Sequence, residues 1–283
     1  MATEKICDLH THSVFSDGTC TPSEIIDEAL ARGLSAIALT DHNTVDGLPS
    51  FSEAGKGKNI ELVTGAEFSV DFNGVELHML GLFIRPEYFA QVSELMREVT
   101  RRKEESNTAL VSSLGKVGIL LDYGEIKSQT PNGKVNRSNI ARAMMAKGYT
   151  ASVDEAFKKF LDKSAGHYKE PKRITSAEII DFLTSIHSLP VLAHPFLNLN
   201  DRELVPFIKD AKKQGLCGME CYYSTYSEKL TELSLSIAKE FGLVASGGSD
   251  FHGYAKPDIH LGVGKGNMRI PYSCYENLKD ALI

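Results

Sequence analysis

The sequence predicts an α/β protein whose strands form a closed barrel, with a helical segment inserted into the chain. Short apolar runs alternate with amphipathic helices along most of the 283 residues, a pattern typical of parallel sheets. The number of these units favours a closed barrel over an open sheet. Residues 91–170 depart from the alternation, because they consist of helical patterns. This segment is therefore the expected insertion.

The expected strands are short apolar runs bounded by turn-forming residues. Asn73-Gly74 is typical of a tight hairpin turn, and it directly precedes one of these runs. In chain order the strands are predicted at Lys5–Leu9, Ser35–Leu39, Glu61–Val63, Val75–Ile84, Pro190–Ala193, Cys217–Tyr222 and Leu243–Ser246.

The expected helices begin at recognisable capping sequences. Thr21-Pro22-Ser23-Glu24 and Thr175-Ser176-Ala177-Glu178 are capping boxes, and Asp201 is expected to cap a helix that runs to Gly215. Within the central segment, helical patterns cover Val92–Leu114, Asn139–Ala146 and Val153–Leu161.

Composition and charge exclude several classes of protein. Apolar residues make up 42% and charged residues 24%, as in an ordinary globular protein. The net charge of −6 argues against a strongly basic nucleic-acid binder, and no apolar run is long enough to suggest a membrane partner. The five cysteines are scattered, and Met1–Leu9 lacks the apolar region of a signal peptide. We therefore expect a cytoplasmic protein with reduced thiols.

The charges are unevenly distributed along the chain. Residues 91–170 hold fourteen Lys or Arg and ten Asp or Glu, a net charge of +4, so the remainder carries −10. Two interpretations of the central segment stay open. Its charges form either a solvated helical surface or a basic cap over an anionic substrate.

Histidines and carboxylates gather at the expected C-terminal ends of the strands, the face on which barrel active sites form. His10 and His12 share one face of an extended segment. Imidazole and carboxylate ligands together suit zinc, manganese or iron. For His167, His187 and His260, which lack such placement, we expect structural or surface roles, with His187 on a helix. The gathered residues are His10, His12, Asp17, His42, Glu67, His78, His194, Asp250 and His252.

Four motifs together resemble those of the PHP (polymerase and histidinol phosphatase) family of phosphoesterases. The resemblance implies a distorted (β/α)7 barrel formed by residues 1–87 and 173–283, with a helical insertion, or cap, at 88–172. The motifs occur in the family's order and are Asp8-Leu9-His10-Thr11-His12, Thr40-Asp41-His42-Asn43, Ala193-His194-Pro195 and Ser249-Asp250-Phe251-His252.

The resemblance also implies a centre of three divalent ions, which would be manganese, zinc or iron. Asp8 and Asp41 would either accept the free N–H of a ligating imidazole or cap turns. Carried over by motif, the first ion would be held by His10, His12, Glu67 and Asp250, the second by Glu67, His78 and His194, and the third by Asp17, His42 and His252.

The reaction that the resemblance implies is hydrolysis of a phosphate ester by a metal-bound hydroxide. Residues 135–143 resemble the insertion motif of a branch that includes nucleoside 3′,5′-bisphosphate phosphatases and 5′→3′ exoribonucleases, which implies that Arg137 clamps the substrate phosphate. Asn139 stands where that branch commonly has a histidine. We expect a nucleoside 3′,5′-bisphosphate as substrate.

Other functions stay open as alternatives to the bisphosphate. They are 5′→3′ exoribonuclease activity on a short RNA, and a phosphatase of the histidinol-phosphatase or general phosphomonoesterase type. A non-catalytic metal-binding barrel is least expected, because no residue of the nine-ligand set is missing.

Overall fold

The computed structural model describes residues 5–130, 133, 135–266 and 268–282. The chain divides into two compact units, Met1–Glu94 with Ile174–Ile283, and Leu95–Arg173. The domain boundaries expected before residues 88 and 173 remain a prediction. In the described ranges, no helix combines the length and apolar character that a bilayer crossing requires.

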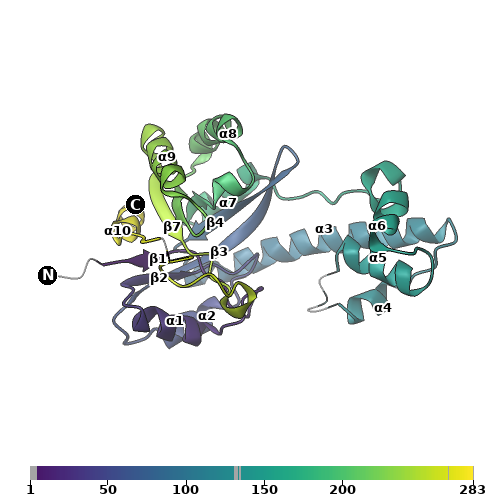
Figure 1. The fold of residues 1–283 in the computed structure, drawn as a ribbon, viewed down its shortest axis with the longest axis horizontal. Coiled ribbons are helices and arrows are strands. Elements are labelled where there is room, and N and C mark those ends of the chain that lie inside the picture. The colour runs from purple at the N-terminus through teal and green to yellow at the C-terminus, as the bar shows by residue number, and fades with distance from the viewer. Residues whose placement is uncertain (1–4, 131–132, 134, 267, 283) are drawn as a thin grey trace. The chain divides into compact units, whose positions relative to one another are not determined.

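The first unit is an α/β barrel of seven strands that is nearly closed (Figure 1). The strands are hydrogen-bonded in chain order, and the backbone N–H of Leu9 donates to Gly247 O at 3.1 Å, which links the first strand to the last. Their bounds are β1 Cys7–Asp8, β2 Ala36–Leu39, β3 Glu61–Phe72, β4 Val75–Leu82, β5 Leu189–Leu192, β6 Gly218–Tyr223 and β7 Val244–Gly248.

β4 is antiparallel to both of its neighbours, whereas the other paired strands are parallel. The hairpin predicted at Asn73-Gly74 joins β3 to β4 and is confirmed, with φ of 52° at Asn73 and 87° at Gly74. In the register of this pair, Glu67 lies opposite Leu80. Since side chains alternate along a strand, His78 lies on the same face of the sheet as Glu67.

Helices of the first unit surround the strands. In Figure 1, α1 and α2 lie on one side of the strands and α7, α8 and α9 on the other. The inner core consists of small and branched apolar residues from the strands, such as Ala36, Val63 and Leu80, together with Leu278 of α10. The bounds are α1 Pro22–Ala31, α2 Leu48–Ala54, α7 Ser176–Ser185, α8 Asp201–Gln214, α9 Glu228–Glu240 and α10 Ser273–Asp280, with short turns η1 Pro86–Tyr88, η5 Pro195–Leu197 and η6 Gly253–Ala255.

Capping explains where several of these helices begin. The boxes at Thr21 and Thr175 are confirmed, because each threonine side chain accepts from the N3 backbone and the N3 glutamate returns the bond. The expected cap at Asp201 is wrong by one residue. Asn200 caps α8 and Asp201 is its first helical residue, because Asn200 accepts from the Arg202 backbone while Glu203 completes the box.

The second unit is helical and has its own core. Leu114 of α3 packs with Ile140 and Met144 of α5 and Leu161 of η3, and all four side chains are buried. The predicted helices are present here, although the third continues beyond its first turn as a π-helix. The bounds are α3 Phe89–Gly115, which starts in the first unit, α4 Tyr123–Ser128, α5 Arg137–Ala146, α6 Val153–Ala156, η3 Phe157–Leu161 and η4 Lys163–Ala165.

Candidate metal centre

Glu67, on β3, lies at the centre of the histidine cluster. Its Oε1 is 2.7 Å from His78 Nδ1 and 2.9 Å from His194 Nε2. Its Oε2 is 3.1 Å from His10 Nε2, 3.2 Å from His12 Nε2 and 3.0 Å from His42 Nδ1. One buried carboxylate therefore joins five imidazoles that come from four different segments of the barrel.

Asp250, two residues after the end of β7, connects this cluster to donors on its other side. Its Oδ1 lies 3.2 Å from His12 Nε2 and 3.4 Å from His252 Nδ1. Its Oδ2 accepts from the Tyr223 hydroxyl at 2.8 Å and from Lys256 Nζ at 2.7 Å. One carboxylate oxygen thus faces the imidazoles, while the other is held by two side chains.

Asp17 forms the exposed edge of the cluster. Its side chain is 59% exposed, and its Oδ1 lies 3.1 Å from His252 Nε2 while its Oδ2 lies 3.8 Å from His42 Nε2. The structure thus brings together all nine residues of the expected ligand set. Three groupings of them could each hold one ion, because their ligand atoms lie within 4.8 Å of one another: His10, His12, Glu67 and Asp250; His42, Glu67 and His78; and His12, Asp17, His42 and His252.

The backbone at the site takes up conformations that most residues avoid. φ is 25° at His194, 57° at Asp250 and 53° at Asn43, which follows His42. Gly248 lies against the first strand so closely that a Cβ there would be 2.1 Å from His10 Cβ. The close approach of β7 to His10 therefore requires glycine at this position.

The electrostatics of the cluster favour charged side chains. Burial alone would raise the pKa of the Glu67 carboxyl, but the neighbouring imidazoles, His10 first, lower this pKa well below its usual range. Burial would likewise lower the pKa of His10, but Glu67 and Glu220 raise it well above its usual range. The pKa of Asp250 is lowered in the same way against its burial by His12 and His10.

Buried polar atoms without partners indicate that the cluster fits metal ions. In the part of the chain that the structure describes, the buried His12 Nδ1 makes no hydrogen bond, and the three imidazole nitrogens near the buried Glu67 Oε2 contact it without hydrogen-bond geometry. Such groups are costly unless an ion or another partner satisfies them. Six imidazoles and three carboxylates form a nitrogen and oxygen donor set that suits zinc, manganese or iron.

The sequence analysis missed Glu220, a buried carboxylate on β6. Its Oε1 lies 3.0 Å from His10 Nδ1, and its Oε2 accepts from the His194 backbone N–H at 2.7 Å. With His10 and His194 it forms a further group whose ligand atoms are close enough to hold an ion. The only signal in the sequence was an acidic residue within a strand that is otherwise apolar.

Unlike Glu220, neither Asp8 nor Asp41 accepts a hydrogen bond from a histidine ring in the described part of the chain. Among the described residues, Asp8 accepts only backbone N–H groups, those of Ser249, Gly262 and His10. Asp41 accepts from the Ser13 backbone at 2.7 Å and from the Ser13 and Ser16 hydroxyls. Of the two expectations, the hydrogen bonds therefore agree with turn capping, and neither carboxylate receives a histidine ring.

Arg137 belongs to the second unit and is engaged there. Its guanidinium lies 4.3 Å from the centre of the Tyr168 ring and 5.5 Å from that of Phe157, and its Nη1 donates to Leu161 O at 3.1 Å. Its expected contact with substrate phosphate stays a prediction.

Comparisons with known proteins agree with this geometry. A family model described as PHP domain matches residues 8–247. A 5′-3′ exoribonuclease of Haemophilus influenzae is 30% identical over 246 residues, covering 87% of this chain and 89% of the relative. A 3′,5′-nucleoside bisphosphate phosphatase of Chromobacterium violaceum is 29% identical, covering 87% and 86%. The crystal structure of a metal-dependent phosphoesterase of Bifidobacterium adolescentis is similar with a TM-score of 0.69 and 25% identity, covering 99% of this chain and 97% of that one.

Proposed function

The chain belongs to the PHP family and is a metal-dependent phosphoesterase. We propose that it removes a phosphate from nucleoside 3′,5′-bisphosphates. The observation that carries the proposal is the position of Glu67, whose two oxygens face five imidazoles. A cluster of this kind concentrates several cations at one point, as the hydrolysis of a doubly charged phosphate monoester requires.

We propose three ions, held as the sequence motifs imply. His10, His12, Glu67 and Asp250 would hold the first, and Asp17, His42 and His252 the third. Glu67, His78 and His194 would hold the second, since both imidazoles lie within 3 Å of Glu67 Oε1. When bound, divalent ions polarise phosphoryl oxygens and lower the pKa of water, which makes a nucleophile available near neutral pH.

The remaining residues orient the ligands and supply charge. Glu220 accepts from His10 Nδ1, which leaves Nε2 directed at Glu67. Tyr223 holds the outer oxygen of Asp250 in the same manner. Lys256 is 42% exposed and contacts that oxygen, so its ammonium can also contact a phosphate bound at the cluster. Arg137 is the second proposed phosphate contact.

A specific observation favours a second candidate, the 5′ end of a short RNA. The relative with 30% identity is named a 5′-3′ exoribonuclease, while the relative with 29% identity is named a bisphosphate phosphatase. A nucleoside 3′,5′-bisphosphate has the 5′-phosphate and the 3′-phosphate ester that the end of such an RNA also carries. Both substrates therefore present a 5′-phosphate and a 3′-phosphoryl group, which is a monoester in the bisphosphate and a diester in the RNA.

The deciding experiment measures phosphate release from adenosine 3′,5′-bisphosphate by protein stripped of metal and reloaded with manganese. Stripped protein and AMP serve as parallel controls. Rapid release that depends on metal, with AMP left intact, would support the proposal. No release would exclude this substrate, and 5′-phosphorylated oligoribonucleotides and histidinol phosphate would be tested next on the same preparation.

A further inference from the structure

A second concave site lies in the first unit, away from the metal ligands. It is a cavity of about 570 Å³ lined by Thr64, Phe83, Arg85, Pro86, His187 and Leu282. None of these residues belongs to a grouping that could hold a metal. Phe83 and Arg85 follow the end of β4, whereas His78 lies in the middle of that strand. The cavity is as large as ordinary sites for small ligands.

Two residues that line this cavity have bulky side chains in a left-handed backbone conformation that glycine adopts with less strain. φ is 61° at Phe83 and 55° at His187. His187 directly follows the C-cap of α7, a position that glycine usually occupies, so the expectation that it lies on a helix is wrong. Among the described residues other than glycine, positive φ occurs elsewhere only at the hairpin residue Asn73 and at three positions of the metal centre, Asn43, His194 and Asp250.

The positions of these strained residues indicate that the cavity has a function. Strained residues persist where the side chain is needed, and they are concentrated at catalytic and ligand-binding sites. In this chain one set lies at the metal centre and the other lines the cavity. Phe83 and His187 come from distant parts of the sequence, so a single turn does not account for both.

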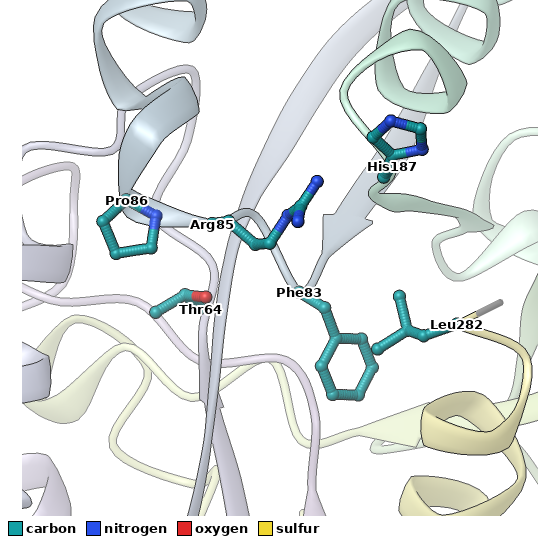
Figure 2. A pocket seen from close by; sticks show the side chains of 6 residues that line it. All are labelled: Thr64, Phe83, Arg85, Pro86, His187 and Leu282. Atoms are coloured by element: carbon teal, nitrogen blue, oxygen red, sulfur yellow. The ribbon is translucent and has the colours of Figure 1, made fainter.

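The polar groups of the cavity leave donors available to a ligand. Figure 2 shows the Arg85 guanidinium extending toward the side on which His187 lies. Arg85 Nε lies 3.3 Å from Glu87 Oε1 and Nη2 donates to the Tyr88 hydroxyl at 3.2 Å, which leaves Nη1 without a protein partner in the described structure. The His187 ring also makes no hydrogen bond to a described residue. Arg85 Nη1 and the His187 ring, both on residues that line the cavity, therefore remain available to a ligand, although Glu87 pairs with Arg85 Nε.

The apolar lining restricts the ligand further. In Figure 2 the Phe83 ring and the Leu282 side chain lie below Arg85 and His187. We propose that this cavity binds a small organic phosphate of mononucleotide size, with its phosphate between Arg85 and His187 and its flat apolar part against Phe83 and Leu282. An inorganic anion would leave this apolar surface uncovered, and an uncharged aromatic molecule would leave the two donors unpaired.

AMP is the probe, and its choice rests on the proposed function, since AMP is the product expected from adenosine 3′,5′-bisphosphate. Binding is measured by equilibrium dialysis of labelled AMP against the manganese-loaded full chain. Arg85→Met should remove one bound AMP per chain and leave the turnover of the bisphosphate unchanged. Arg101→Met, at an exposed arginine paired with Glu98 and Glu105, is the matched control and should bind AMP as the original chain does.

A second variant uses the backbone strain. His187→Gly removes the imidazole but relieves the left-handed conformation, so the thermal midpoint should not fall while AMP affinity falls about tenfold, as expected for the loss of a hydrogen bond to a charged group. Adenosine and inorganic phosphate should each compete poorly. Benzyl phosphate, which joins a phosphate to a flat apolar ring, should compete, and its failure to compete would contradict the proposed contacts.

The outcomes separate this proposal from the proposed function. Equal AMP stoichiometry in the original chain and in Arg85→Met would overturn the cavity as a phosphate site, even if the bisphosphate is hydrolysed. Loss of one AMP in Arg85→Met from a preparation that does not hydrolyse the bisphosphate would support the cavity and reject only the proposed substrate.

Discussion

At the scale of single residues, the site depends on carboxylates that each serve several histidines. Glu67 shares one oxygen between His78 and His194 and the other among His10, His12 and His42. Asp250 divides its oxygens between imidazoles and the pair Tyr223 and Lys256. Loss of one such carboxylate would therefore affect more than one ion.

Glu220→Gln tests the carboxylate that orients His10. The amide keeps the size of the side chain but removes the charge next to His10 Nδ1, so we expect metal affinity to fall by about 10- to 100-fold. Metal competition with a chromophoric chelator measures the change. Glu53→Gln, at an exposed carboxylate of α2 that is paired with Lys56, is the control. Equal affinities in both variants would contradict the orienting role.

Lys256→Met and Arg137→Ala test the two proposed phosphate contacts. Removal of a charge-assisted hydrogen bond costs about 1.5–3 kcal/mol, so each loss should raise KM or lower kcat by about 10-fold or more while metal content stays the same. Kinetics with adenosine 3′,5′-bisphosphate and metal analysis of the same samples give both readouts. Lys213→Met, at an exposed lysine of α8 paired with Asp210, is the control. Unaltered kinetics in Lys256→Met or Arg137→Ala would remove that residue from the site.

The protonation of His78 makes metal binding depend on pH. Burial lowers the pKa of His78, but its bonds to Glu67 and Glu76 raise this pKa to about 9 in the metal-free protein. A ligating imidazole must lose its proton, so apparent metal affinity should rise between pH 7 and pH 9 with release of protons. Calorimetry in buffers of different ionisation enthalpy counts these protons.

The same shift has the opposite effect on the metal-free fold. Since the folded pKa is above the unfolded value of about 6.5, the ion pairs of His78 stabilise the metal-free protein fully below about pH 6.5, and this contribution is lost as pH rises through about 9. Metal affinity that falls between pH 7 and pH 9 would contradict both statements.

At the scale of elements, capping residues determine where helices begin, and one of them also contacts the end of a strand. The Thr175 box starts α7, and Thr175 also forms a bridge with Asp71 near the end of β3. The capping boxes could be predicted from the sequence because they depend on side chains three residues apart. The length of β3 could not be predicted in this way, since its second half forms its ladder with β4, across the hairpin at Asn73.

Thr175→Ala tests this cap. The N3 backbone N–H of Glu178 would lose its acceptor, so the free energy of unfolding should fall by about 1 kcal/mol. Denaturant unfolding at fixed metal concentration measures the change. Thr108→Ala removes an exposed threonine from the interior of α3, where alanine is a better helix former, and should not destabilise the protein. A loss of equal size in both variants would contradict the cap.

At the scale of the whole molecule, the metal centre joins segments that are distant in sequence. Its candidate ligands lie on β3 and β4 or in the segments that follow β1, β2, β5 and β7. Ions that bind this arrangement, and that bind the unfolded chain weakly, must stabilise the fold through mass action.

Removal of metal tests this linkage. At a free concentration 100 times Kd, a single site stabilises by about 2.7 kcal/mol, so the loaded protein should unfold at least several degrees above the stripped protein. Scanning calorimetry with and without manganese measures the difference. The shift should be smaller in Glu67→Gln, and a midpoint that is unaffected by manganese would contradict a metal centre built on these ligands.

The sequence by itself predicted most of the elements and the nine candidate ligands that the structure brings together. Apolar runs, capping boxes and the Asn73-Gly74 turn are local signals, and histidines at strand ends converge wherever strands form a barrel, because the carboxyl ends of the parallel strands share one face. These features could therefore be predicted without knowing the contacts between side chains that are distant in the sequence.

Only the tertiary structure showed which other side chains contact the candidate ligands. Glu220 lies on a strand between apolar residues, and nothing near it in the chain reveals that His10 and His194 lie against it. Lys256 and Tyr223 reach Asp250 from separate segments, and Phe83 and His187 meet at one cavity although 104 positions separate them. Such contacts depend on the packing of distant segments, which the pattern of nearby residues does not encode.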